Sequence, residues 1–157
     1  MLEKYWIFYI GGEDVRMRIP ILKKMIEKGY SVGAIGCNDS NAFKDQEITY
    51  FDYYLNRSIS PLQDIKSIRQ LRNIFQRERP YLIHLFDTKP GVLTPKVAKT
   101  SGVKFVVRTV TGMGFVFSSN SIFVKALRPF YRLMQKRAIR YTDSVIFQNT
   151  DDKEYFE

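Results

Sequence analysis

Short segments rich in β-branched and aromatic residues alternate with helical patterns along almost the whole chain. Most of these segments are apolar throughout, which is typical of strands buried on both faces of a parallel sheet. Parallel neighbours need a crossover, and the helical patterns supply it. We therefore expect an α/β fold with a doubly wound parallel sheet, in one domain spanning residues 1–157. The expected strands are residues 4–10, 31–37, 47–53, 81–86, 104–110 and 144–147, and the expected helices occupy about 19–26, 60–79, 91–101 and 122–140.

Glycine, serine and proline mark the ends of these helices. Gly29 and Gly102 stand where a glycine in the left-handed conformation ends a helix. Ser60 and Pro61 are typical first residues of a helix, and Gln63 completes the pattern of a capping box. In the helix that follows, one apolar face is expected to pack on the sheet, and its members are Leu62, Ile65, Ile68, Leu71 and Phe75.

Positive charge is concentrated in one stretch of the chain. The formal net charge is +9, and residues 88–142 carry 11 basic and no acidic side chains. Residues 143–157 carry one basic and five acidic side chains. A basic field of this kind attracts polyanions, which include phosphates, nucleic acid and an anionic membrane leaflet. Composition alone does not choose among them.

The remaining composition narrows the class of protein. Hydrophobic residues make up 45% of the chain, which excludes a disordered segment. No apolar run approaches the roughly 18 residues that a membrane-spanning helix needs. The single cysteine, Cys37, forms no internal disulfide and is interpreted as a small buried hydrophobe in a reducing, cytoplasmic compartment. With one histidine and no cysteine pair, we expect neither a metal ion nor a cofactor.

Ligands of parallel sheets bind at the carboxyl ends of the strands, so three loops are candidates for a substrate site. After the first strand, a glycine pair permits either the approach of a ligand to helix N–H groups or an ordinary tight turn. The fourth strand contains the only histidine, which is more typical of a core than of a catalytic position. An aspartate and a lysine after this strand either pair with each other or contact a substrate hydroxyl and phosphate. Two glycines after the fifth strand form either an anion nest or a flexible connector. The candidate residues are Gly11, Gly12, His84, Asp87, Lys89, Thr111, Gly112 and Gly114.

A basic amphipathic helix is expected between Phe123 and Arg140, with a kink or restart at Pro129. Its apolar face is expected to consist of Phe123, Leu127, Phe130 and Met134. The basic face is either solvated or lies on an anionic membrane, and two aromatic residues in the preceding loop favour contact with something apolar. The candidate membrane-binding residues are Phe115, Phe117, Lys125, Arg128, Arg132, Lys136 and Arg140.

Three segments resemble motifs of the bacterial family 4 glycosyltransferases of capsule, O-antigen and exopolysaccharide assembly. Residues 83–90 read IHLFDTKP and resemble V-H-T-F-T-x-K-P after the fourth strand of that family. Residues 109–117 read TVTGMGFVF and resemble its T-x-T-G-L-G-Y/F-x-F loop. Residues 147–156 read FQNTDDKEYF and resemble F-Q-N-x-D-D-x-x-x-F. The segments come in the expected order, and the resemblance covers the whole chain.

The resemblance implies the N-terminal, Rossmann-like half of a GT-B glycosyltransferase, which holds the acceptor. The acceptor of such enzymes is often a lipid-diphosphate-linked saccharide at the inner face of the cell membrane. The donor, a nucleotide sugar, binds a C-terminal domain that residues 1–157 are expected to lack. The implied reaction is hexosyl transfer to a hydroxyl, with retention and without a metal. The chain is then expected to be cytoplasmic, peripheral at the membrane, and inactive by itself.

One departure from the family pattern bears on catalysis. Many relatives carry a histidine at the position of Thr111, where it contacts the transferred sugar, so no catalytic residue is assigned here. Two alternatives remain open at this point. The basic stretch 88–142 would also suit a nucleic-acid-binding module, although no nucleic-acid motif is present and no nucleic-acid partner is expected. The chain would also suit a stand-alone subunit that recruits a separate donor-binding chain to the membrane.

Overall fold

A computed structural model describes residues 6–56, 58, 60–111, 122–150 and 153–154. Along residues 122–127 it describes the helix but not the side chains. Several candidates from the sequence therefore lie outside the described residues. These are Gly112, Gly114, Phe115, Phe117 and the side chain of Lys125.

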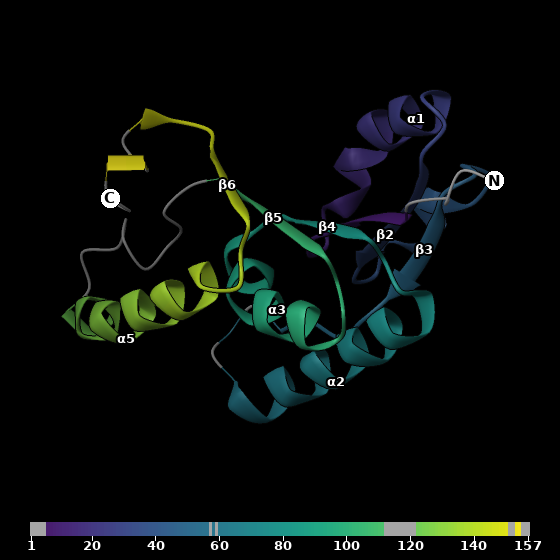
Figure 1. Ribbon diagram of the computed structural model, residues 1–157. Coiled ribbons are helices and arrows are strands. Elements are labelled where there is room, and N and C mark those ends of the chain that lie inside the picture. Colours follow the sequence, from purple (N-terminus) through teal and green to yellow (C-terminus); the bar gives the residue numbers. More distant parts are fainter. Residues whose placement is uncertain (1–5, 57, 59, 112–121, 151–152, 155–157) are drawn as a thin grey trace.

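Six parallel strands form one sheet in the order β3-β2-β1-β4-β5-β6 (Figure 1). All five neighbouring pairs are parallel, which confirms the predicted α/β fold of Rossmann-like type. The strands lie where the sequence predicted them, and most are one to three residues shorter than predicted. The strands are β1 (Trp6–Ile10), β2 (Ser31–Gly36), β3 (Thr49–Asp52), β4 (Leu82–Leu85), β5 (Phe105–Val110) and β6 (Ser144–Phe147).

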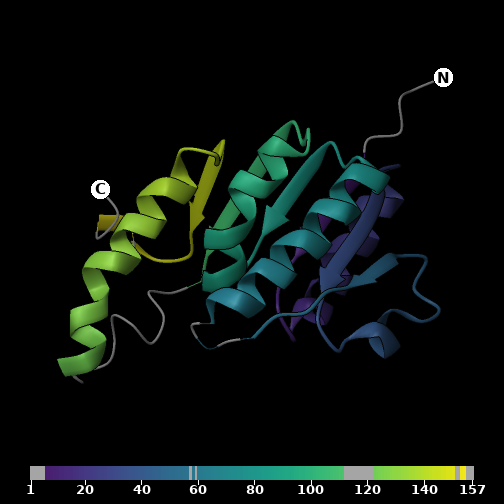
Figure 2. The ribbon, with the colours of Figure 1, turned by 90° about the horizontal axis from the view of Figure 1, so that it is seen from below.

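Helices cover the two faces of this sheet unequally (Figures 1 and 2). α1 (Ile19–Glu27) and the short helix η1 (Val15–Arg18) lie on one face, while α2 (Pro61–Glu78), α3 (Thr88–Thr100) and α5 (Ile122–Ile139) lie on the other. A second short helix, η2 (Ser40–Phe43), connects β2 to β3. Alternate side chains of β1 point to opposite faces of the sheet and join two separate hydrophobic clusters. Phe8 and Ile10 pack with α2 and α3, whereas Ile7 and Tyr9 pack with η1 and α1.

Strand order reverses between β1 and β4. From β1 the chain moves outward to β2 and β3, then crosses back to β4 and moves outward in the opposite direction to β6. The loops that leave the carboxyl ends of β1 and β4 therefore diverge. A crevice between such ends is where open α/β sheets bind their ligands.

The helix-ending glycines and the start of α2 at Ser60 and Pro61 were predicted correctly, whereas the capping box at Gln63 and the start of α3 at Gly91 were wrong. Gly29 and Gly102 have φ of 86° and 91°, as expected for residues that end helices. Ser60 caps α2 without a side-chain hydrogen bond, and the Gln63 side chain accepts a bond from the side-chain amide of Asn56. Gly91 lies inside α3 rather than at its start.

The early start of α3 has a packing reason. Gly91 N–H donates to the carbonyl of Asp87 at 3.1 Å, so the helix begins at Thr88. A β-carbon on Gly91 would lie 2.5 Å from Nε of Arg108, so the buried guanidinium of β5 packs directly on the helix backbone. Arg108 also donates to Gln135 of α5. This contact sets the spacing of β5, α3 and α5.

The apolar face of α2 is shorter than expected. Its buried residues are Ser67, Leu71, Ile74 and Phe75, whereas Leu62 and Ile65 are 83% and 45% exposed. The first two turns of α2 extend past the hydrophobic core. Their apolar residues keep the helical spacing but are not buried.

Candidate functional site

Gly11 and Gly12 meet Asp87 at the carboxyl ends of β1 and β4. The N–H of Gly12 donates to Oδ2 of Asp87 at 2.9 Å. The carbonyl of Gly11 accepts a hydrogen bond from the Tyr53 hydroxyl at 3.0 Å, and its N–H donates to the Ile35 carbonyl. A β-carbon on either glycine would lie 3.4–3.5 Å from Oδ2 of Asp87. Three of the predicted residues are thus in contact at the crevice.

The backbone of Asp87 is strained. Its φ of 66° and ψ of 157° lie in a region that residues other than glycine rarely occupy. Such a conformation costs on the order of 1–3 kcal/mol and persists where the surroundings enforce it. The bond from Gly12 and the start of α3 hold the residue in place. Strained residues at strand ends often have functional roles.

Burial raises the pKa of the Asp87 carboxyl above its ordinary value. The Gly12 N–H opposes this rise, the neighbouring Asp14 carboxyl adds to it, and Arg18 opposes it. The crevice therefore holds two carboxyl groups close together, one of them poorly hydrated.

Lys89 does not face the crevice. Its Nζ lies 2.5 Å from the Asn56 carbonyl oxygen, 2.6 Å from that of Ser58 and 2.6 Å from Oδ1 of Asp64. The interpretation in which Lys89 pairs with Asp87 is therefore wrong. Because α3 begins at Thr88, Lys89 projects toward α2 and ties the loop before α2 to α3.

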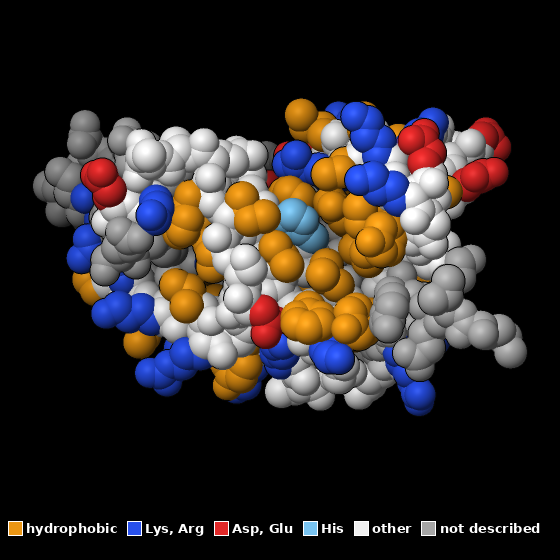
Figure 3. Space-filling model, turned by 45° about the horizontal axis from the view of Figure 1, so that its top comes forward, with side chains coloured by type: hydrophobic (Ala, Val, Ile, Leu, Met, Phe, Trp, Pro, Cys, Tyr) orange, Lys and Arg blue, Asp and Glu red, His pale blue; other side chains and the backbone are white. Residues whose placement is uncertain are grey.

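His84 belongs to the sheet face that carries α1. Its Nε2 lies 2.7 Å from Oγ1 of Thr109, and its ring contacts those of Tyr9 and Phe86 at centroid distances of 5.1 and 4.3 Å. Burial lowers the pKa of His84 to about 4, and Arg18 adds to this effect. The imidazole is therefore neutral at pH 7, and its side chain is half-buried at the surface of the sheet rather than part of the core. Hydrophobic side chains surround the only histidine in Figure 3.

Thr111 follows the carboxyl end of β5 and is exposed. β5 is the neighbour of β4, so Thr111 lies on the same edge of the sheet as Asp87. The sequence missed two residues of this region. Asp14 precedes η1 and Arg18 is its last residue, and the guanidinium of Arg18 lies 4.1 Å from the centroid of the Phe86 ring. Their positions shortly after the first strand were the only feature of the sequence that could have indicated both residues as candidates.

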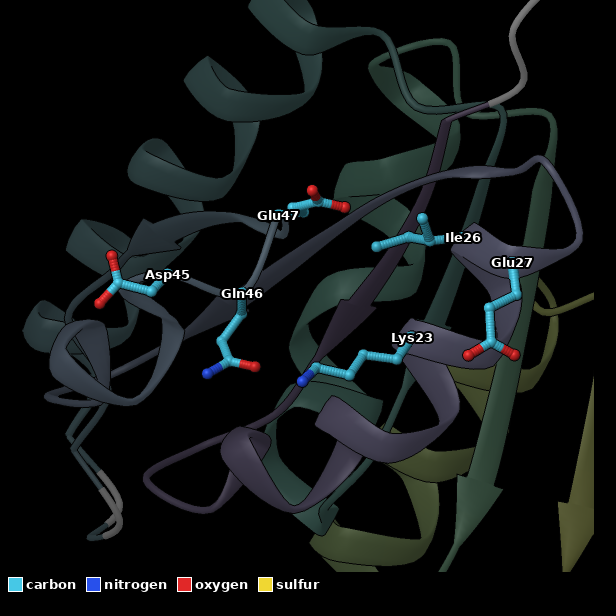
Figure 4. A pocket seen from close by; sticks show the side chains of 6 residues that line it. All are labelled: Lys23, Ile26, Glu27, Asp45, Gln46 and Glu47. Atoms are coloured by element: carbon cyan, nitrogen blue, oxygen red, sulfur yellow. The ribbon is translucent and has the colours of Figure 1, made fainter.

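A cavity of about 310 Å³ lies elsewhere (Figure 4). Lys23, Ile26 and Glu27 of α1 line one side of it, and residues 45–47 line the other. Residues 45–47 precede β3, so the cavity lies toward the amino end of a parallel strand, away from the crevice. In the parts of the chain that the structure describes, no group of three His, Cys, Asp or Glu residues could hold a metal ion.

The outer face of α5 mixes basic and apolar side chains. Gln135 and Ala138 are buried toward the core, and α5 packs on α3. Phe130 and Leu133 are 56% and 47% exposed, so part of the expected apolar face of α5 is not covered by the domain. The helix turns its small and polar residues inward because Gln135 meets the buried Arg108. Beside the exposed apolar pair lie the exposed basic residues Arg132, Lys136, Arg137 and Arg140, and Arg128 is half-buried. None of the described helices is long and apolar enough to cross a membrane.

Comparison with known proteins identifies relatives among sugar-transferring enzymes. The model of the family described as glycosyl transferase 4-like matches residues 7–149. An Escherichia coli protein, UDP-Gal:alpha-D-GlcNAc-diphosphoundecaprenol alpha-1,3-galactosyltransferase, is 29% identical over 110 residues, or 70% of this chain. That match spans 27% of the length of the relative.

Solved structures share the fold. MurG of Acinetobacter baumannii aligns over 94% of this chain and 42% of its own, with a TM-score of 0.63 and 12% identity. A glycosyltransferase from Rickettsia africae aligns over 98% of this chain and 39% of its own, with a TM-score of 0.67 and 15% identity. The chain therefore spans less than half the length of each of these three proteins.

The strain at Asp87 predicts an unusual order of stabilities for two variants. Both Asp87→Ala and Asp87→Gly lose the bond to Gly12, but only glycine relaxes the backbone at φ 66°. Glycine ordinarily costs about 0.5–1 kcal/mol relative to alanine. Here the glycine variant should be the more stable by about 1 kcal/mol in urea unfolding. An alanine variant that equals or exceeds it in stability would show that the backbone is unstrained.

The low pKa of His84 predicts a pH-dependent stability. In the unfolded chain the imidazole titrates near 6.5, whereas in the fold its pKa is about 4. Between these values the unfolded state binds the proton more tightly, so the free energy of unfolding should fall as the pH drops from 6.5 to 4. His84→Gln should remove the part of the pH dependence of stability that comes from the imidazole, while the carboxyl groups titrate as before. Urea midpoints of both proteins measured across this range should converge at low pH, and parallel curves would contradict the assignment.

Proposed function

The chain belongs to the glycosyl transferase 4-like family, and we propose that it is the acceptor-side domain of a glycosyltransferase in bacterial surface polysaccharide biosynthesis. The donor, a nucleotide sugar, binds a further domain outside residues 1–157. In the reaction the bond from the anomeric carbon to the donor diphosphate breaks and a bond to an acceptor hydroxyl oxygen forms. The hydroxyl proton is released, and the nucleoside diphosphate leaves.

The observation that carries this proposal is the crevice at the point where strand order reverses. Gly11 and Gly12 allow close approach at the end of β1, and the Asp87 carboxyl lies between the ends of β1 and β4. A second, donor-binding domain facing these strand ends would bring its sugar to the acceptor there. Thr111 stands on the same edge and is proposed as a further contact.

The acceptor is proposed to be a saccharide linked to a lipid through diphosphate. The name of the Escherichia coli relative describes transfer of galactose to such a molecule. A lipid-linked acceptor requires the enzyme to work at a membrane surface. The exposed basic and apolar side chains of α5 suit that surface, because lysine and arginine attract anionic headgroups while Phe130 and Leu133 enter the interface.

The basic stretch favours a membrane over nucleic acid. On α5 the exposed cations alternate with large exposed apolar side chains, a mixture that suits the boundary between headgroups and acyl chains of a membrane. We therefore place the protein in the cytoplasm, peripheral at the inner face of the cell membrane.

Ligand preference tests the acceptor role. The 157-residue chain should bind a water-soluble, short-prenyl diphosphate analogue of the acceptor and should not bind UDP-sugars, as measured by calorimetry. It should transfer no sugar from a panel of sugar nucleotides to membrane extracts. Turnover by this chain would contradict the division into halves, and an absence of analogue binding would contradict the acceptor role.

Liposome co-sedimentation tests the membrane surface. Each lysine or arginine near an anionic surface contributes on the order of 1 kcal/mol, so several on one helix give reversible binding that weakens as salt rises. The wild-type chain should pellet with anionic but not with neutral vesicles. Replacing Arg128, Arg132 and Lys136 with Gln should abolish pelleting.

A matched control removes the same charge from another helix. Lys66, Arg69 and Arg72 are exposed on α2, and their replacement with Gln should leave pelleting unchanged. Equal loss in both triple variants would mean that only net charge matters, and no loss in either would mean that α5 is merely solvated.

A further inference from the structure

Three oxygen atoms surround the ammonium group of Lys89. Its Nζ lies 2.5 Å from the Asn56 carbonyl oxygen, 2.6 Å from that of Ser58 and 2.6 Å from Oδ1 of Asp64. The side chains of Lys89 and Asp64 are only 20% and 16% exposed. An ammonium group carries three N–H donors, so three close oxygens are as many as it can bind directly. A phosphate group could therefore reach Lys89 only by displacing one of these partners.

The three oxygens lie in the segment that joins β3 to α2 or in the first turn of α2. We call this segment the β3–α2 connection, and its described residues are 53–56, 58 and 60. Side chains of α2 hold it as well: the Tyr54 N–H donates to Oε1 of Gln70 at 2.7 Å, and the Tyr54 carbonyl accepts a bond from the Ser67 hydroxyl. Lys89 belongs to α3, which packs beside α2 (Figures 1 and 2). The lysine therefore fastens the connection to a second helix.

The β3–α2 connection starts at the carboxyl ends of the strands. The Tyr53 hydroxyl donates to the Gly11 carbonyl at 3.0 Å, and Cδ2 of Leu55 would lie 3.4 Å from a β-carbon on Gly12. β3 itself ends at Asp52, on the same edge of the sheet. Ligands of open parallel sheets bind at this edge. The position of the connection therefore contributes to the shape of the surface at which the acceptor is proposed to bind.

We propose that Lys89 is a positioning residue for the acceptor: it holds the β3–α2 connection in the shape that the acceptor binds and does not itself bind acceptor phosphate. Only molecules in which the connection has this shape can bind, so a looser connection lowers the apparent affinity in proportion. Asp64 acts in the same direction, because it holds the ammonium group close to the two carbonyl oxygens. This inference rests on the proposed function, since it assumes an acceptor at the strand ends.

Asp64 distinguishes this role from a direct contact with phosphate. If Lys89 were a phosphate ligand, the Asp64 carboxylate would compete with phosphate for the ammonium group, and Asp64→Asn would strengthen binding. If Lys89 acts through the connection, Asp64→Asn weakens binding, because a neutral amide oxygen holds an ammonium group less strongly than a carboxylate does. The two roles therefore predict opposite changes in affinity.

Calorimetry and amide hydrogen exchange test the role of Lys89. The 157-residue chain is titrated with the water-soluble, short-prenyl diphosphate analogue. Lys89→Met should weaken binding about tenfold, as expected if the connection then keeps its binding shape about a tenth of the time. Asp64→Asn should weaken binding about threefold, because it loosens the lysine without removing it. In both variants the amides of Tyr54 and Ser58 should exchange faster, while those of β1 and β4 keep their wild-type rates.

A matched control removes the same charge from the same helix. Lys96 is exposed on α3, and Lys96→Met should change neither the affinity nor the exchange rates. Asp64→Asn also decides the question if Lys89→Met does not fold.

Four results would overturn the inference and leave the proposed function standing. They are tighter binding by Asp64→Asn, wild-type affinity in Lys89→Met, wild-type exchange at Tyr54 and Ser58 in both variants, and a loss of affinity in Lys96→Met equal to that in Lys89→Met. A wild-type chain that does not bind the analogue would instead overturn the proposed function, and the positioning role of Lys89 with it.

Discussion

The reversal of strand order between β1 and β4 is the constraint on which the rest of this structure depends. It sends the chain to opposite sides of the sheet and makes the two loops at the carboxyl ends diverge. The glycine pair after β1 and the aspartate after β4 are 75 positions apart in sequence, yet they join through one hydrogen bond across this gap. That bond fixes a strained residue at the start of α3, and α3 in turn packs on β5 and α5.

Charge is divided between two surfaces of the domain. The carboxyl ends of β1 and β4 carry the carboxyl groups of Asp14 and Asp87, while α5 carries several exposed lysines and arginines and the exposed apolar residues Phe130, Leu133 and Ile139. This division suits an acceptor with two chemically different ends. A saccharide donates hydroxyl hydrogen bonds to carboxylates, and a lipid diphosphate in an anionic membrane lies close to basic side chains. The buried contact between Arg108 and Gln135 joins the strand and the helix that lead to these two surfaces.

The parallel sheet, the positions of its strands and the glycines that end two helices followed from the sequence because each depends on local or topological rules. Apolar runs mark buried strands, glycine marks a left-handed helix end, and parallel strands bring their carboxyl ends to one edge. The partners of individual polar side chains did not follow. Lys89 sits two positions after Asp87 but pairs with Asp64, because α3 starts earlier than its glycine suggested.

Helix faces were predicted less well for a related reason. The spacing of apolar residues in α5 assigned Phe130 to its apolar face, but the face that packs on the domain includes Gln135, which is buried and bonded to Arg108 of β5. Leu62 and Ile65 continue an apolar stripe past the end of the core that α2 covers. The spacing of apolar residues predicts which side chains share one face of a helix. The neighbouring elements determine whether that face is buried, and over how many turns.

Photo-crosslinking tests the central claim most directly. An acceptor analogue with a diazirine on its saccharide is irradiated with the chain, and the labelled peptides are identified by mass spectrometry. The account predicts labels on residues 10–14 and 86–88, at the strand ends that enclose the Gly12–Asp87 contact. Labels confined to the cavity beside residues 45–47, or labelling that an excess of unmodified analogue does not reduce, would contradict it.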